Sequence, residues 1–152
     1  REYDSISVCL SKGLGAPVGS VLVGSTETLY KAHRWRKMFG GGMRQAGILA
    51  AAGIYSLENN VHRLSEDHHR AMEIATAVER MDSYEVDLEQ VQTNMVYVKC
   101  DKGGAESLIH RLEKLGIQAL TIDSSTIRIV THLHITDEDV QRTISALESA
   151  QP

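Results

Sequence analysis

Residues 5–23 read SISVCLSKGLGAPVGSVLV, and this stretch decides how the chain begins to fold. The two apolar runs at its ends, 5–10 and 20–23, are typical of β-strands. The residues between them include three glycines and one proline, which favour a loop. Because this loop is too short to contain a crossover helix, we expect the two strands to pair antiparallel if they are neighbours.

A lysine opens this loop. Lys12 directly follows the first strand and is flanked by small residues. A strand fixes the position of the Cα atom that follows it, and glycines leave room for a ligand. A neutral lysine amine attacks carbonyl carbons, so Lys12 is a candidate nucleophile for Schiff-base chemistry. The alternative interpretation is a solvated lysine on a surface turn.

A second glycine-rich segment follows a cationic stretch. Arg34, Arg36 and Lys37 precede Gly40-Gly41-Gly42, and Arg44 comes two residues later. Glycine-rich backbone can turn several N–H groups toward one point, and the start of a helix adds a positive dipole end. With Arg44 in its first turn, this segment predicts a site for a phosphate or carboxylate. The alternative is a helix break with solvated charges.

An arginine stands in the middle of a predicted strand near the end of the chain. In residues 126–130, alternation places Ile127 and Ile129 on one face and Arg128 on the other. Arg128 could therefore project into a cleft and hold a carboxylate through two parallel hydrogen bonds. A surface arginine is the alternative. His132 and His134 would share a face if the strand extended that far, but no third ligand is evident, so no metal site is predicted.

The remaining elements follow from apolar periodicity. Ser25 is expected to cap a helix that runs to about Met38, and residues 43–57 are apolar almost all round, which predicts a buried helix. Between residues 61 and 81, apolar residues recur at helical spacing, which predicts a further helix. Beyond it, strands are predicted at 84–88, 95–100, 118–121 and 126–130, and helices at 104–115 and after a Thr136 cap.

Composition narrows the class of protein. The chain has 152 residues, of which 42% are hydrophobic, and a net charge of −4. No basic field attracts nucleic acid and no apolar run approaches the ~20 residues of a membrane span, so neither partner is expected. Both cysteines are expected to be buried in a reducing compartment. The absence of an initiator Met and of a signal peptide suggests the back part of a longer, cytoplasmic chain.

Three stretches together resemble one enzyme family. They are SKGLGAPVGS from residue 11, RKMFGGGMRQ from residue 36, and RIVTHL from residue 128. Their combination is similar to the low-specificity L-threonine and L-allo-threonine aldolases. The resemblance runs from about Asp4 to about Leu147, and it implies an α/β fold-type I enzyme that depends on pyridoxal 5'-phosphate (PLP), of which this chain is the C-terminal part.

The resemblance also implies domains and residue roles. Residues 1–60 would close the large PLP-binding α/β domain, 61–82 would be a connecting helix, and 83–152 a small α+β domain. Lys12 matches the catalytic lysine that forms a Schiff base with the cofactor, and Arg128 matches the arginine that holds the substrate carboxylate. Lys37 and Arg44 match residues that reach the cofactor phosphate across a subunit interface, which implies a homo-oligomer, typically a dimer of dimers.

The implied reaction is retro-aldol cleavage of a β-hydroxy-α-amino acid to glycine and an aldehyde. The front half of the family pattern is not present in the sequence, so we expect the chain alone to be inactive without the N-terminal half. Two alternatives remain open. One is another PLP lyase of the same fold class that catalyses β-elimination, and the other is a non-catalytic assembly module built on residues 83–150.

Overall fold

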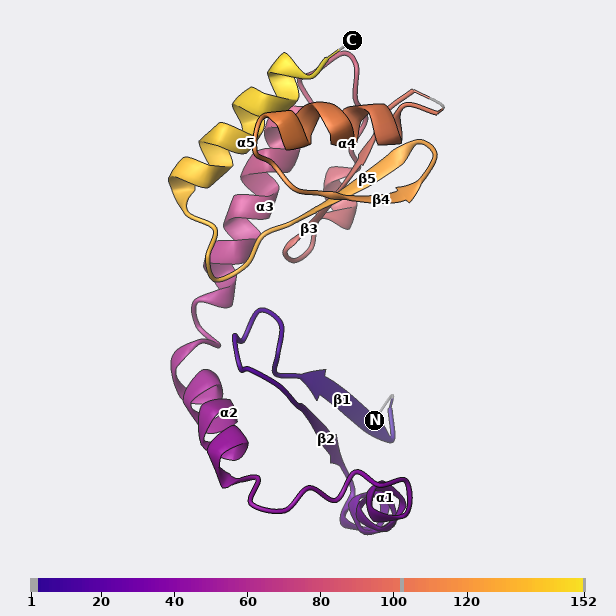
Figure 1. Ribbon diagram of the computed structural model, residues 1–152, viewed down its shortest axis with the longest axis vertical. Coiled ribbons are helices and arrows are strands. Elements are labelled where there is room, and N and C mark those ends of the chain that lie inside the picture. The colour runs from indigo at the N-terminus through magenta and orange to yellow at the C-terminus, as the bar shows by residue number, and fades with distance from the viewer. Residues whose placement is uncertain (1–2, 102, 152) are drawn as a thin grey trace. The chain divides into compact units, whose positions relative to one another are not determined.

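The structure is a computed structural model that describes residues 3–101 and 103–151 (Figure 1). Contacts within the chain divide it into two units, residues 1–63 and 64–152. Helix α3 (Leu64–Val78) packs against β3 and α5 and therefore belongs to the second unit, although its sequence suggests a connecting helix. Among the described residues, no helix is long and apolar enough to cross a bilayer.

The first unit begins with the expected antiparallel hairpin. Strands β1 (Ser5–Cys9) and β2 (Ser20–Gly24) pair in a register that sets Cys9 opposite Ser20. Helix α1 (Thr26–Met38) starts where predicted, because the Ser25 side chain accepts a hydrogen bond from the Thr28 N–H at 3.2 Å. The strand pairing and the helix cap predicted from sequence are both confirmed.

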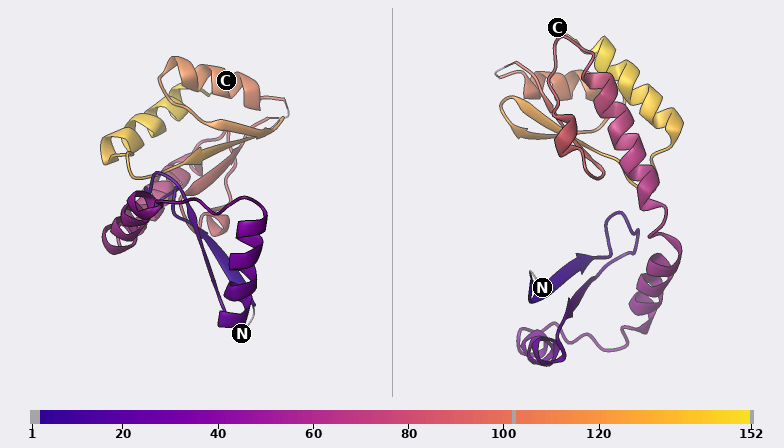
Figure 2. Two further views of the ribbon diagram at one scale, coloured as in Figure 1. Left: turned by 60° about the horizontal axis from the view of Figure 1, so that its bottom comes forward. Right: turned by 180° about the vertical axis from the view of Figure 1, so that it is seen from behind.

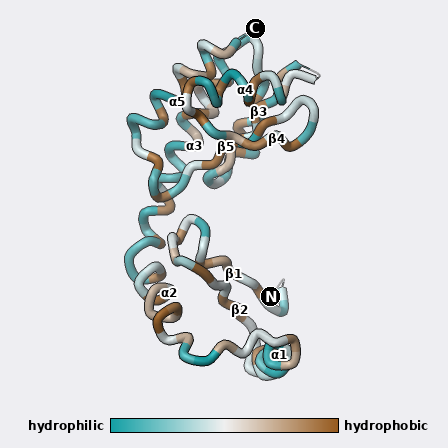
Figure 3. The backbone as a smooth tube through the Cα atoms, in the orientation of Figure 1, coloured by the Kyte–Doolittle hydropathy of each residue, from teal (hydrophilic) through white to brown (hydrophobic). Residues whose placement is uncertain are grey.

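Helix α2 (Gly47–Asn59) corrects two expectations. It begins four residues later than predicted, after Gln45 takes a φ of 52° in the left-handed region. It is also largely exposed: only Gly53 and Ser56 are buried, while Ile48 is 84% exposed. The apolar residues of α2 and of the neighbouring hairpin are visible as brown segments (Figure 3). Burial needs a facing element, and within the described first unit the neighbour of α2 is the loop after β1. Cys9, expected to be buried, is likewise exposed.

The second unit is a three-stranded antiparallel sheet with helices on one side (Figure 2). Its strand order is β3-β5-β4, so β5 is the central strand. The predicted strand at 84–88 is wrong: Glu85 makes one isolated bridge to Lys99, and the 3-10 helix η1 then starts at an Asp87 cap. The other elements are β3 (Met95–Lys99), α4 (Ala105–Lys114), β4 (Leu120–Asp123), β5 (Thr126–Val130) and α5 (Asp137–Ser149).

The core of the second unit lies between the sheet and its helices. Alternate residues of β3 and β5 point into it, and helices α3, α4 and α5 supply the facing side chains. Full burial of one such aliphatic side chain contributes about 1.5–3 kcal/mol to stability. The largest of these fully buried side chains are Ile74, Leu108, Leu112, Ile127, Leu147, Val78, Val96 and Val98. The opposite face of the sheet is left open, and Arg128 projects from its centre.

Candidate functional site

The loop that carries Lys12 is closed by backbone hydrogen bonds. The Leu10 N–H donates to the Gly19 carbonyl at 2.9 Å, and the Leu10 carbonyl accepts from the Ala16 N–H at 3.0 Å. The Lys12 carbonyl accepts from the Gly15 N–H at 2.8 Å. The Lys12 side chain is exposed. The backbone under this amine is thus fixed while the amine itself is accessible.

Helix α2 packs against the loop that carries Lys12. Leu10 and Leu14 are buried, and the Asn60 side-chain amide donates to the Leu14 carbonyl at 2.7 Å. At Gly53, an added Cβ would lie 3.1 Å from the Leu10 Cδ1, so the loop packs closely on the helix backbone. Asn60 is a site residue that sequence reasoning missed, because nothing in an Asn-Asn pair at a helix end indicates a contact 46 residues away in the sequence.

In the cationic bend after α1, the side chains of Arg36 and Lys37 lie close to the backbone of Gly41 and Gly42. An added Cβ at Gly42 would lie 2.6 Å from the Lys37 Cδ and 2.9 Å from its Nζ. The equivalent atom at Gly41 would lie 2.9 Å from the Arg36 Cγ. Lys37 therefore lies across the bend, and Arg44 follows it as an exposed residue. Arg44 precedes α2 rather than lying in its first turn, so the expected support of a helix dipole at Arg44 is wrong.

Arg128 lies on the open face of the sheet in the second unit. Its register partners are Tyr97 on β3 and Leu120 on β4. The Arg128 Nε is buried, and no described residue accepts a hydrogen bond from it. Arg128 also lines a cavity of about 810 Å³, together with residues of β4, of the segment after β5 and of α5. A buried N–H without an acceptor is unfavourable, which makes this guanidinium ready to bind an anion.

Strand β5 ends at Val130, and His132 and His134 lie in the segment that follows it. The His132 Nδ1 accepts from the His134 N–H at 3.3 Å, and the two rings meet edge to face with centroids 5.7 Å apart. The condition for a shared strand face of His132 and His134 is therefore not met, since the strand stops at Val130. Within 3–101 and 103–151, no group of three or more His, Cys, Asp or Glu side chains could hold a metal ion.

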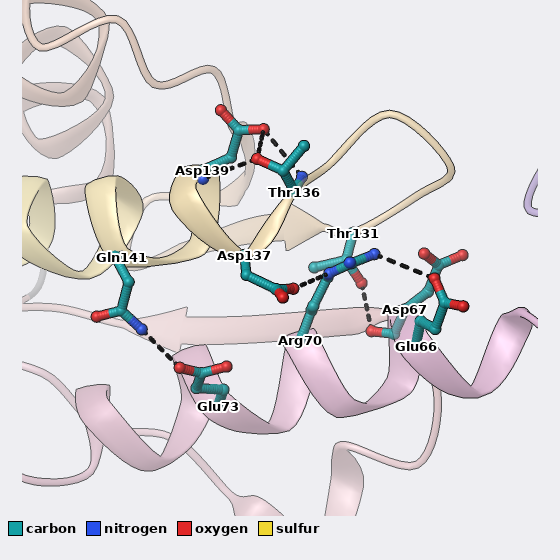
Figure 4. Close-up of polar contacts among 9 residues, drawn as sticks. All are labelled: Glu66, Asp67, Arg70, Glu73, Thr131, Thr136, Asp137, Asp139 and Gln141. Atoms are coloured by element: carbon teal, nitrogen blue, oxygen red, sulfur yellow. Dashed lines mark hydrogen bonds and ion pairs between the residues drawn. The ribbon is translucent and has the colours of Figure 1, made fainter.

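A polar network fixes the end of the arginine strand (Figure 4). The buried Thr131 hydroxyl donates to the Asp67 carbonyl at 2.7 Å, which ties β5 to α3. The Asn94 side chain donates to the Thr131 carbonyl at 2.7 Å, and the Thr131 N–H donates to the Asn94 carbonyl at 3.0 Å. Sequence reasoning missed Asn94, because its role depends on a partner far along the chain.

A second part of this network begins helix α5. Asp139, which lines the same cavity as Arg128, accepts hydrogen bonds from the Thr136 N–H and hydroxyl at 2.9 and 2.8 Å. These bonds lower the pKa of the Asp139 carboxyl below its usual value. Arg70 also joins α3 to α5 through a 2.8 Å ion pair with Asp137. The carboxylate at the edge of the cavity is thus ionised and already engaged.

Residues 1–101 match the family described as beta-eliminating lyase. The chain belongs to this family. The match includes the Lys12 loop and the cationic bend. Arg128 lies in the part beyond the match.

A sequence relative extends the similarity over the rest of the chain. The chain is 45% identical, over 99% of its length, to low-specificity L-threonine aldolase 1 of Arabidopsis thaliana, of which it covers 43%. The chain spans about two fifths of the length of the curated relatives that it matches, with 43%, 42% and 40% covered in three of them.

Solved structures show the same fold. A Listeria monocytogenes protein provisionally assigned as an L-allo-threonine aldolase aligns with a TM-score of 0.74 at 17% identity, covering 97% of this chain and 45% of that one. A high-resolution structure of SPT with PLP aligns with a TM-score of 0.75 at 16% identity, covering 97% and 39%. These neighbours confirm the expected fold-type I class.

Proposed function

We propose that this chain is part of a PLP-dependent aldehyde-lyase that cleaves a β-hydroxy-α-amino acid, such as L-threonine or L-allo-threonine, into glycine and an aldehyde. The observation that carries this proposal is the similarity to a threonine aldolase along almost the whole chain. The geometry agrees with it, because an accessible lysine, a cationic bend and an arginine whose Nε has no acceptor among the described residues are the groups that such a reaction needs.

The residues present fit a cofactor that carries an aldehyde and a phosphate. Lys12 offers an exposed amine on a fixed backbone. The glycines at 41 and 42 leave the space that Arg36 and Lys37 occupy, and this space keeps both cations against the bend. When bound, PLP supplies an electron sink for the charge that develops at the substrate Cα. Lys12 would hold it at the aldehyde carbon, and Lys37 and Arg44 would bind its phosphate from a neighbouring subunit.

Arg128 would hold the carboxylate of the substrate. A guanidinium binds a carboxylate through two parallel hydrogen bonds, which fixes the orientation of the attached Cα as well as its position. The orientation of Cα decides which of its bonds is broken, so this contact helps to select cleavage of the Cα–Cβ bond. The Thr131 and Asn94 hydrogen bonds keep the end of the arginine strand in place during this contact.

We further propose that the rest of the polypeptide and a second subunit complete the site. Residues 1–60 would end the large PLP-binding domain, 61–82 would connect, and 83–152 would form the small domain. The exposed apolar side chains of β2 and α2 support this view, because a two-stranded hairpin needs further packing to be stable. The complete enzyme would be a homo-oligomer, a dimer of dimers, working in the cytoplasm, and this chain alone would be inactive.

Substitution of Lys12 tests the proposal. In the complete enzyme, Lys12→Ala should abolish the yellow, borohydride-reducible adduct with PLP and reduce threonine cleavage by about a thousandfold or more. Lys114→Ala, at an exposed lysine of the second unit, serves as the matched control and should keep both. A colourless wild-type protein, or an adduct indifferent to Lys12→Ala, would favour the assembly-module alternative.

The family match supports a second candidate activity, β-elimination by the same cofactor. The two reactions differ in products: retro-aldol cleavage gives glycine and an aldehyde, whereas elimination gives ammonia and a 2-oxo acid, which is pyruvate from serine and 2-oxobutanoate from threonine. Product analysis with threonine and with serine therefore separates them. Ammonia and a 2-oxo acid as the main products would replace the aldolase proposal with the β-elimination alternative.

A further inference from the structure

The open face of the three-stranded sheet places two side chains on either side of Arg128. In an antiparallel pair, residues directly opposite each other lie on the same face with Cβ atoms about 4.5–5.5 Å apart. Tyr97 is the partner of Arg128 on β3, and Leu120 is its partner on β4. The arginine stem is thus flanked by a phenol ring on one side and an isobutyl group on the other.

These flanks differ in what they offer to a cation. An aromatic ring beside a guanidinium attracts it electrostatically and also shields it from water, whereas a leucine only shields it. The Tyr97 hydroxyl lies 3.8 Å from the Met95 Sδ, so it is directed along β3. Tyr97 is 38% exposed and Leu120 is 57% exposed, so neither is a core residue.

The Nε of Arg128 is buried, although Arg128 as a whole is only half-buried. The Nε atom is hidden from solvent although the sheet face is open, and no described residue accepts its proton. Removing water from a charged donor strengthens its hydrogen bond to an incoming anion, because the surroundings no longer compete for it. Side chains on both sides of an arginine also restrict the rotation of its guanidinium, which favours one bidentate geometry.

We propose that Tyr97 is a positioning residue for the substrate carboxylate. Its ring forms the wall on the β3 side of Arg128, excludes water from the guanidinium and holds it in the orientation that pairs with a carboxylate. This inference rests on the proposed function, in which Arg128 holds that carboxylate. It assigns the effect to the aromatic ring, so the phenol oxygen is dispensable.

Three Tyr97 variants of the complete enzyme test the inference. Glycine, the carboxylate-bearing product, is the probe, and its dissociation constant is measured by calorimetry on PLP-loaded protein. Tyr97→Ala and Tyr97→Leu should each weaken glycine binding by about 5- to 20-fold, the range expected for loss of a partly desolvated cation–ring contact. Tyr97→Phe should stay within about twofold of wild type, because it keeps the ring.

Kinetics give a second readout. A contact that is equally strong in the ground and transition states affects KM and leaves kcat unchanged. Tyr97→Ala should therefore raise KM for threonine by a factor similar to that for glycine, with kcat within about twofold. Ile122→Ala is the matched control, since it removes an exposed apolar side chain from β4 that is not the partner of Arg128. It should leave both constants unchanged.

A double-mutant cycle separates positioning from a general structural effect. If Tyr97 acts through Arg128, Tyr97→Ala should weaken glycine binding no further once Arg128→Ala is present. Equal effects of Tyr97→Ala in both backgrounds, or a loss with Tyr97→Phe as large as with Tyr97→Ala, would overturn the inference. If Arg128→Ala itself left glycine binding intact, the proposed role of Arg128 would fail. If only Arg128→Ala weakened binding, the role of Tyr97 alone would fail.

Discussion

Gly116 shows how one residue ends a helix and opens the cavity beside Arg128. Its φ is 79°, in the left-handed region that favours glycine. The Gly116 N–H donates to the Glu113 carbonyl at 2.9 Å, and the Ile117 N–H donates to the Leu112 carbonyl at 2.9 Å. This double pattern is a Schellman motif, which satisfies the last carbonyls of α4 and turns the chain toward β4.

Gly116→Ala should therefore destabilise the protein by about 1–2 kcal/mol, because the added Cβ is strained at this φ whatever space surrounds it. The Arg142 guanidinium, 2.6 Å from the position of that Cβ, would also have to move. Urea unfolding of the second unit measures the change. Lys114→Ala is the control, since it changes an exposed residue of α4 in the same unit, and it should change stability by less than about 0.5 kcal/mol. Equal stability of the two variants would contradict the argument.

At the scale of an element, the start of helix α5 is fixed by contacts of a few residues. Its capping box is complete: the Thr136 hydroxyl accepts from the Asp139 N–H at 3.2 Å, and the Asp139 side chain accepts from the Thr136 N–H at 2.9 Å. The ion pair between Arg70 and Asp137 joins the same helix start to α3 (Figure 4). The first turn of α5 thereby fixes one side of the cavity that Arg128 lines.

The capping box predicts a loss of stability in acid. The pKa of Asp139 is lowered in the folded chain, so its ionised form favours folding above the ordinary pKa of 3.8, and this contribution is lost as pH falls through the folded value. Asp139→Asn should make the melting temperature less dependent on pH below about 4. Thr136→Ala should cost about 1 kcal/mol at neutral pH. An unchanged acid slope in Asp139→Asn, with Glu138→Gln as control, would refute this account.

At the scale of the whole molecule, the two units differ in how well they bury their apolar residues. The second unit contains one continuous core of side chains from α3, α4, α5, β3 and β5. The first unit buries Leu10, Leu14 and Ala16, while Trp35 and Phe39 stack on an exposed face of α1. Stability comes mainly from buried apolar area, so the units should differ in their ability to fold alone.

We predict that residues 64–152, produced alone, unfold in one cooperative transition, because the core needs no side chain from residues 1–63. Residues 1–63 alone should show no cooperative transition and should bind a hydrophobic dye, since their apolar faces have no partner. Thermal circular dichroism and dye fluorescence measure both. Cooperative melting of residues 1–63 would show that this unit packs better than its exposure suggests.

Local patterns in the sequence determined most of the elements. Ser25 and Thr136 cap their helices as predicted. A cap is a contact between residues three positions apart, so the local sequence is enough to predict it. Alternation in residues 126–130 placed Ile127 and Ile129 in the core and Arg128 outside it. The glycine-rich loop after the first strand also indicated Lys12 as a candidate site residue. The family match and the fold agree with the resemblance that these motifs carry.

Only the tertiary structure decided what surrounds these residues. That Tyr97 and Leu120 flank Arg128, that Asn94 holds Thr131 and that Asn60 holds the Lys12 loop are contacts between residues far apart in sequence. The apolar pattern of α2 predicted burial, yet the helix is exposed. An apolar pattern indicates only that one face of a helix needs another segment to pack against. Which segment supplies that partner depends on how the chain folds back on itself, and no local pattern contains that information.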